Sequence, residues 1–209
     1  TGYVLILDPI VSYWTTREIA RDQDSGKTAL ISSGMFSSIA IAAYIGIVVI
    51  FESHIEVDLG LLLFATMLIP LSYIRSVLQS VSLGYKPEIR SFGIIAFEIT
   101  KIPVGLFLIY FLDLGLMGAI LTVVIATTIA VIVIGIKIRS KIQVSFQKTY
   151  LKNWLKRFWI PTYPKISNRI MNLDVVAFTI LGGSIGDLAY WTAANAVSKM
   201  VAHAGHISS

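Results

Sequence analysis

Long runs of apolar residues, separated by short polar gaps, make up most of this chain. A helix needs about 20 residues to cross a hydrocarbon core of about 30 Å. The runs that reach this length are 29–51, 59–83, 91–112, 114–136 and roughly 160–182. Shorter apolar runs lie at 1–14 and 188–207. None alternates polar and apolar residues as barrel strands do, so the pattern predicts an all-α, polytopic helical membrane protein.

Lys and Arg concentrate in every second gap between the runs. The gaps with several cations are 15–28, 84–90 and 137–157. The gaps between them contain acidic residues and neither Lys nor Arg: 52–58, Asp113 and 183–187. Because Lys and Arg resist translocation, they stay on the cytoplasmic side of a membrane. The alternation predicts a multi-pass protein of the cytoplasmic membrane whose three basic gaps face the cytoplasm.

The composition agrees with a membrane protein. Hydrophobic residues are 56% and charged residues 14% of the 209, whereas soluble domains have about 25% charged residues. The net charge of +5 lies in alternate gaps rather than on one stripe, which favours a membrane surface as partner and no nucleic acid. Since apolar runs lie at both ends and the first residue is not Met, we expect a piece of a longer protein.

An aspartate immediately precedes three of the apolar runs. These residues are Asp58, Asp113 and Asp187, each followed by Leu. Asp accepts hydrogen bonds from the free amides of a first helical turn and complements the helix dipole, so we expect N-caps here. The simpler alternative is that Asp is common in turns.

The longest basic stretch, 138–158, is amphipathic. Its aromatic and aliphatic residues recur every four positions, and its lysines, spaced seven, four and four residues apart, form a neighbouring row. The two rows are Ile142, Phe146, Tyr150, Trp154 and Phe158, and Lys141, Lys148, Lys152 and Lys156. This pattern predicts a helix in the inner membrane interface; the alternative is a solvated connector.

Ionisable residues inside membrane spans are costly and face cavities or each other. In this chain they are Asp8, Arg75, Glu98, Lys101, Lys165, Arg169 and Asp174. Glu98 and Lys101 are three residues apart and share a helix face, so they could neutralise each other. Arg169 and Asp174 diverge by roughly 140° and need partners on other helices or a wet cavity.

The cations of this set outnumber its carboxylates, which suits an anionic substrate such as a phosphate or pyrophosphate. A carboxylate in the same cavity could carry a coupling proton or cation. For Arg75 and Lys165 the alternative is snorkelling toward the inner boundary. Pro70 is expected to kink the helix that carries Arg75.

Catalytic motifs are absent from the sequence. His54, His203 and His206 are not spaced as metal ligands with carboxylates, and no Gly-rich phosphate loop occurs. The outer gaps are too short to house an extramembrane active site. We therefore expect neither an enzyme, nor a metal site, nor a cofactor.

Six short segments carry a family resemblance: 7–9 (LDP), 16–21 (TREIAR), 77–86 (VLQSVSLGYK), 112–119 (LDLGLMGA), 166–174 (ISNRIMNLD) and 190–195 (YWTAAN). They resemble segments of the Wzx-like (RfbX-type) polysaccharide-biosynthesis flippases of the multidrug/oligosaccharidyl-lipid/polysaccharide exporter superfamily. They are similar to parts of the second, fourth, sixth, seventh and eighth helices of that family. Pro9 departs from its pattern, where Leu-Gly is more usual.

The resemblance implies a fragment of a two-lobe, MATE-like transporter with twelve to fourteen helices. Residues 1–137 would be an N-terminal transmembrane lobe lacking its first helix, 138–158 the cytoplasmic inter-lobe linker, and 159–209 the start of the C-terminal lobe. It implies export of a polyprenyl-pyrophosphate-linked oligosaccharide by alternating access, with membrane lipid and lipid-linked sugar as partners. The expected pathway residues are Arg169, Asp174, Asn168, Lys165, Lys101, Glu98, Arg75 and Arg17.

Three other functions stay open at this point. A cation-coupled multidrug exporter of the same superfamily would need an acidic cavity. A membrane-embedded glycosyltransferase or ligase would need a long outer loop with catalytic carboxylates. A scaffold subunit would form a stable complex with a partner enzyme.

The pathway assignment predicts a phenotype for the deepest pair of charged residues. Arg169→Ala and Asp174→Asn in the full-length protein are expected to lower the amount of polysaccharide at the cell surface, because each removes a charged group that contacts the cargo or its coupling ion. Unchanged surface polysaccharide in both variants would show that the pathway is assigned wrongly.

Overall fold

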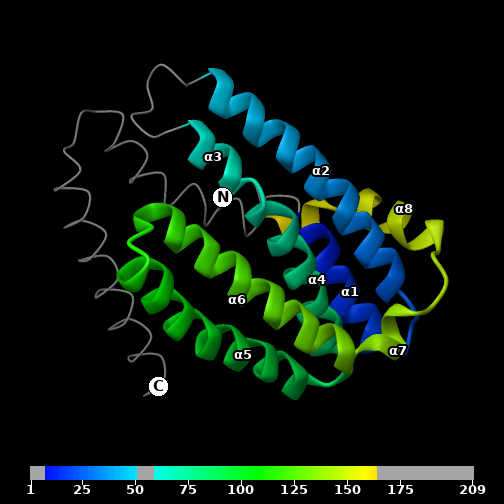
Figure 1. Ribbon diagram of the computed structural model, residues 1–209. Coiled ribbons are helices and arrows are strands. Elements are labelled where there is room, and N and C mark those ends of the chain that lie inside the picture. The colour runs from blue at the N-terminus through cyan, green and yellow to red at the C-terminus, as the bar shows by residue number, and fades with distance from the viewer. Residues whose placement is uncertain (1–7, 51–58, 164–209) are drawn as a thin grey trace, which may run out of the picture. The chain divides into compact units, whose positions relative to one another are not determined.

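The computed structural model describes residues 8–50 and 59–163, and every regular element in these two ranges is a helix (Figure 1). In chain order they are α1 Asp8–Ile19, α2 Gly26–Ile50, α3 Leu59–Ala65, α4 Leu68–Tyr85, α5 Pro87–Gly105, the π-helix η3 Leu106–Phe111, α6 Gly115–Lys137, α7 Arg139–Ile142 and α8 Lys148–Lys156. The prediction of an all-α chain is confirmed for this part of the chain.

Four helical segments are long and apolar enough to cross a membrane. They are Gly26–Ile50, Leu59–Tyr85, Pro87–Phe111 and Gly115–Lys137. Each matches one of the predicted spans, with ends shifted by a few residues. Most of the fifth predicted span, 160–182, lies outside the described residues, and so do Lys165, Asn168, Arg169 and Asp174. Of the stretch 159–209, predicted to start a C-terminal lobe, only 159–163 are described, and that lobe stays a prediction.

Helix α4 is the central element of the described part, because α1, α2, α5 and α6 all pack against it. Its buried side chains include Tyr73, Val77 and Val81, none of which is exposed to solvent. Helices α1 and α4 are parallel, since Asp8 lies beside Ser76 and Thr16 donates a hydrogen bond to the carbonyl of Ser80 one turn later. This arrangement is expected if the chain crosses a membrane at every apolar run, because α2 then runs in the direction opposite to both α1 and α4.

The span Leu59–Tyr85 is broken next to Pro70, as expected from its sequence. Pro70 lacks an amide and clashes with the carbonyl of Thr66, four residues earlier. Helix α3 ends at Ala65, the amide of Thr66 bonds the carbonyl of Leu63, and α4 begins at Leu68. The carbonyl of Leu62 accepts the hydroxyl of Tyr44 from α2 at 3.1 Å. A side chain from a neighbouring helix thus replaces a backbone donor at the break.

Asp113 does not cap α6, so the N-cap prediction is wrong at this position. The N-cap residue is Leu114, and no side-chain hydrogen bond caps the helix. Asp113 has a φ of +49° and Gly115 a φ of +51°, both left-handed. Asp113 therefore lies in the turn that follows η3, where Asp tolerates this conformation, one residue too early to cap. Asp58 and Asp187 lie outside the described residues.

The stretch 138–158 contains two short helices instead of the single helix that its four-residue repeat predicts. Residues 143–147 between α7 and α8 are not helical. The amide of Gln147 bonds the side-chain oxygen of Thr28 at 2.9 Å, which ties the bend to the start of α2. Gly26 permits the close approach of α7, because a Cβ there would overlap the carbonyl of Lys141. The role of this stretch as an inter-lobe linker stays a prediction.

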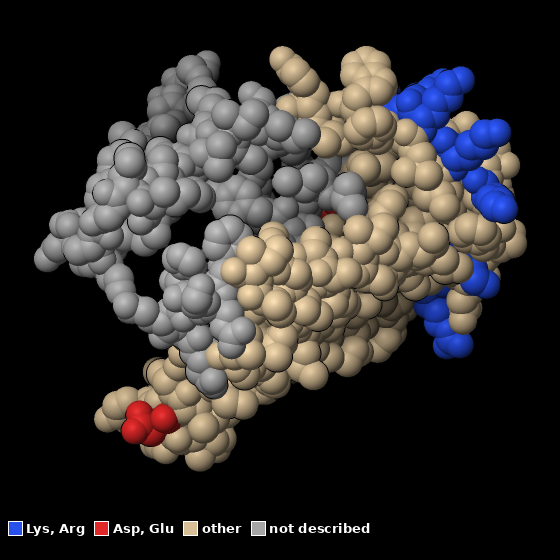
Figure 2. Space-filling view, turned by 90° about the horizontal axis from the view of Figure 1, so that it is seen from above, with Lys and Arg blue, Asp and Glu red and all other residues tan. Residues whose placement is uncertain are grey.

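Charge separates along the described helices. Figure 2 shows Lys and Arg gathered at one end of the molecule and an acidic group at the opposite end. The basic end is formed by the ends of α1, α4 and α6 and by the starts of α2 and α5. We call it the inner end below, because the charge pattern of the sequence predicts that it faces the cytoplasm.

A glycine at the contact of α1 with α4 gives a test of this packing. A Cβ on Gly84 would lie 2.6 Å from the carbonyl oxygen of Thr16 and 2.9 Å from the Cβ of Ile19. Gly84→Ala is expected to destabilise the protein by about 1–3 kcal/mol, since the backbones must separate. The measurement is the Tm of the detergent-solubilised protein.

Gly34→Ala is the matched control. A Cβ on Gly34, also in a helix, would meet no atom within 4 Å. This change should leave the Tm unchanged or raise it slightly, because alanine favours the helix. Equal effects of both changes on the Tm would contradict the close α1–α4 contact.

Candidate functional site

Three of the predicted pathway residues meet at the contact of α4 with α5. The guanidinium carbon of Arg75 lies 3.9 Å from the centre of the Phe97 ring, and the Nζ of Lys101 lies 5.1 Å from the same centre. Lys101 also forms an ion pair with Glu98, at 2.5 Å. One aromatic ring thus holds two cations that come from different helices. We call these four residues the Phe97 cluster.

The Phe97 cluster lies about halfway along the spans. Arg75 precedes the last residue of α4, Tyr85, by ten positions, which is about 15 Å of helix. Lys101 follows the first residue of α5, Pro87, by 14 positions, or about 21 Å. The guanidinium of Arg75 therefore contacts a ring near the middle of its span. Snorkelling of Arg75 toward the inner boundary stays the alternative interpretation.

The cluster combines a net positive charge with partial exposure. Side chains of Lys101 and Glu98 are 39% and 49% exposed, and Arg75 is half-buried. The Glu98–Lys101 pair forms as its spacing predicts, but the second cation leaves an excess of one positive charge. Because hydrocarbon is a poor environment for such groups, this side of α4 and α5 is expected to face water or another part of the protein. A guanidinium and an ammonium on one ring can bind a phosphate oxygen together.

Arg17 is not part of this cluster. It is exposed near the end of α1, where its Nη1 donates to the hydroxyl of Tyr13 at 2.9 Å. Its guanidinium carbon also lies 5.5 Å from the Tyr13 ring centre and 5.9 Å from that of Trp14. The structure thus holds Arg17 among aromatic rings at the inner end.

A second polar group, between α1 and α4, was not among the predicted site residues. Asp8 is buried, with 8% of its surface exposed. Ser12 donates to its Oδ1 at 3.0 Å and Ser76 to its Oδ2 at 2.7 Å, and the two hydroxyl oxygens are 3.0 Å apart. We call these residues the Asp8 site.

A signal for the Asp8 site is present in the sequence. Polar residues recur every four positions on each of the two helices, and each series follows one helix face. They are Asp8, Ser12 and Thr16 on α1, and Ser72, Ser76 and Ser80 on α4. The repeats indicate a polar face on each helix, but not that the two faces meet.

The inner end of α1 is bound to α8 through a buried tryptophan. Trp154 is 1% exposed, and its Nε1 donates to the Oε1 of Glu18 at 2.9 Å. Tyr150 stacks on Trp154, with ring centres 6.3 Å apart. Burial raises the pKa of Glu18, and the hydrogen bond from Trp154 lowers it in part. Burial also raises the pKa of Tyr150.

No group of three or more His, Asp or Glu side chains is placed to hold a metal ion in residues 8–50 and 59–163. The polar groups that these residues do bring together are suited to electrostatic binding. Two cations lie at the Phe97 ring, the Asp8 carboxylate accepts hydrogen bonds from two serine hydroxyls, and the Glu18 carboxylate accepts one from the Trp154 indole.

The raised pKa of Glu18 predicts a pH-dependent stability. The folded protein holds the proton on Glu18 more tightly than the unfolded chain does, so stability is gained as pH falls through the folded pKa toward the ordinary glutamate pKa of 4.5. At higher pH the buried charge costs stability, and Glu18→Gln removes it while keeping an acceptor for Trp154. The Tm of Glu18→Gln should exceed that of the wild type at neutral pH and approach it at low pH.

Glu88→Gln, at an exposed position in the first turn of α5, is the control and should show no such convergence. A difference in Tm between Glu18→Gln and the wild type that does not change with pH would contradict the assignment.

Comparisons with protein-family models, with curated proteins and with solved structures find no match to this chain.

Proposed function

We propose that this chain is part of a membrane transporter that flips an anionic, lipid-linked oligosaccharide across the cytoplasmic membrane by alternating access. The observation that supports it is the Phe97 cluster, in which Arg75 and Lys101 meet over one ring with a single carboxylate beside them. The cargo would be a polyprenyl-pyrophosphate precursor of a polysaccharide.

The chemistry of the cluster fits the charged part of such a cargo. A pyrophosphate carries its charge on oxygens that a guanidinium binds through two parallel hydrogen bonds. The Phe97 ring attracts both cations, whose charged groups lie 3.9 and 5.1 Å from its centre, without neutralising either. Glu98 offsets one of the two charges, so the bound anion could also leave.

The location of the cluster fits alternating access. A site about halfway along the spans can be reached from either side when the surrounding helices tilt, and transporters place their substrate sites at this depth. The break between α3 and α4 lies on the span that carries Arg75. A broken span has fewer fixed hydrogen bonds and is a candidate hinge.

A cation-coupled multidrug exporter is the second candidate, and the Asp8 site favours it. A buried carboxylate with two hydroxyls is a group that could exchange a proton or bind a monovalent cation. In a flippase the same site would carry the coupling ion instead. The two functions differ in which site binds the cargo.

An enzymatic function has less support. A glycosyltransferase or ligase needs carboxylates on an outer loop of some size. The connection between η3 and α6 is only Leu112–Leu114, and its single carboxylate is Asp113.

The flippase proposal predicts which charges export needs. In the full-length protein, Arg75→Gln and Lys101→Gln are each expected to lower export about tenfold or more, since each removes a charge-assisted hydrogen bond of about 1.5–3 kcal/mol to the cargo. The measurements are polysaccharide at the cell surface and lipid-linked precursor retained in the inner leaflet.

Arg90→Gln is the matched control, because it removes one positive charge from an exposed position at the inner end. It should leave export unchanged. Normal export with Arg75→Gln and Lys101→Gln, together with loss of resistance to cationic drugs in Asp8→Asn, would favour the multidrug exporter and reject the flippase.

A further inference from the structure

The surface of α8 has three distinct faces. Tyr150 and Trp154 face the protein, as their stacking and the burial of Trp154 show. Leu151 and Leu155 lie on the neighbouring face, about 100° around the helix axis from Tyr150 and Trp154. Lys148 and Lys152 lie on the far side of the two leucines. Of the leucines, Leu155 is 46% exposed. An apolar row and a basic row therefore lie side by side on a helix that is fixed to the protein by its aromatic face.

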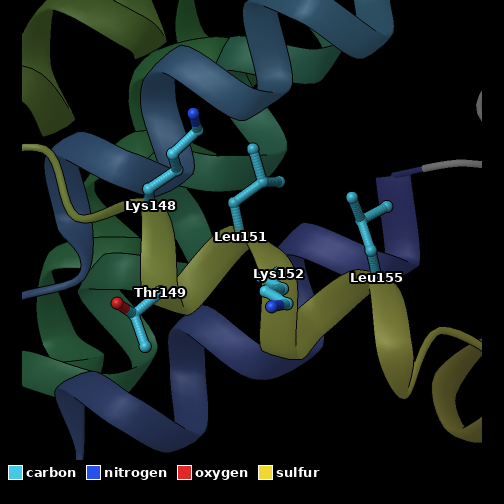
Figure 3. A pocket seen from close by; sticks show the side chains of 5 residues that line it. All are labelled: Lys148, Thr149, Leu151, Lys152 and Leu155. Carbon is cyan, nitrogen blue, oxygen red and sulfur yellow. The ribbon is translucent and has the colours of Figure 1, made fainter.

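These two rows line a groove. Figure 3 shows the side chains of Lys148, Thr149, Leu151, Lys152 and Leu155 along α8, which border a volume of about 520 Å³. Leu151 and Leu155 project from one side of the helix, and Lys148 and Lys152 are one turn apart. Lys148 and Lys152 form no ion pair with residues 8–50 or 59–163. Their charges are thus available to an anion.

The groove lies at the inner end of the helices. The residue before α8, Gln147, bonds Thr28 near the start of α2, and Trp154 bonds Glu18 near the end of α1. Basic residues gather at this end of the described part of the chain (Figure 2). If the spans cross a bilayer, α8 lies at the depth of the headgroups, where an apolar row reaches acyl chains and lysines reach phosphates.

We propose that the groove along α8 binds an anionic glycerophospholipid of the inner leaflet. The phosphodiester lies between the ammonium groups of Lys148 and Lys152. The acyl chain lies against Leu151 and Leu155. Charge complementarity selects an anionic over a zwitterionic lipid, and the apolar row selects a lipid over a soluble anion. The groove is separate from the Phe97 cluster, so this inference does not depend on the proposed cargo.

The test counts lipids on the full-length protein. The protein is reconstituted in phosphatidylcholine nanodiscs that contain phosphatidylglycerol, and native mass spectrometry measures the retained phosphatidylglycerol. Lys148→Gln with Lys152→Gln is expected to weaken binding about fivefold for each lysine removed. Lys156→Gln with Arg157→Gln removes the same charge from the last residue of α8 and the residue after it, neither of which lines the groove, and should leave binding nearly unchanged.

A second comparison distinguishes a lipid from a soluble anion. Leu151→Ser with Leu155→Ser should weaken binding of long-chain phosphatidylglycerol but not of inorganic phosphate. The Tm in detergent confirms folding of each variant. Displacement of the bound lipid from the wild-type protein by short-chain phosphatidylglycerol measures binding at the same site without any mutation.

Three results would overturn the proposal. Equal loss of lipid in both double lysine and arginine variants would indicate a diffuse basic surface. Equal retention of phosphatidylcholine and phosphatidylglycerol by the wild type would exclude selection by charge. Full displacement of the lipid by inorganic phosphate would indicate a site for soluble anions.

Discussion

Water is absent from the core of a bilayer, so each amide and carbonyl of a crossing segment must find a partner within the protein. This constraint explains why the described chain consists of helices. It also explains why a side-chain donor replaces the missing backbone donor where a helix is broken. At the break before α4, the carbonyl of Leu62 takes the hydroxyl of Tyr44 in place of an amide. Within the helices, the hydroxyls of Ser82 and Thr122 bond carbonyls four residues earlier.

The same constraint makes α4 the element on which the polar chemistry depends. It is enclosed by α1, α2, α5 and α6, so its polar side chains point at neighbouring helices. Two adjacent residues face different neighbours. Arg75 contacts the Phe97 ring of α5, and Ser76 bonds Asp8 of α1. A shift of α4 would therefore change the Phe97 cluster and the Asp8 site together.

Polar groups at the inner end need fewer partners within the protein, because outside a hydrocarbon core water and headgroups can form hydrogen bonds with them. There α8 is held by one buried indole on Glu18 and by the bond from Gln147 to Thr28. Its lysines and leucines stay on the outside. The aromatic face fixes the helix, and Lys148 and Lys152 form no ion pair with the described residues.

The spans could be predicted from the sequence because crossing a bilayer is set by length and hydropathy, which are local properties. The break at Pro70 was predictable for the same reason, since a missing amide acts four residues away. The Glu98–Lys101 pair needed only the helical repeat. Predictions that depended on backbone detail were wrong. Asp113 lies in a left-handed turn instead of an N-cap, and the four-residue repeat of 138–158 is divided by a bend.

The sequence by itself determined that the described part of the chain is helical, where its four helices long enough to cross a membrane lie, and which residues carry charge inside them. Only the tertiary structure decided which charges meet. Asp8 and Ser76 are 68 residues apart, and Arg75 reaches Phe97 across the α4–α5 contact. Periodicity states which side chains share a face of one helix, but the rotation of each helix about its axis is set by packing against its neighbours. The pairing of faces, and with it the position of both candidate sites, is therefore a property of the folded chain.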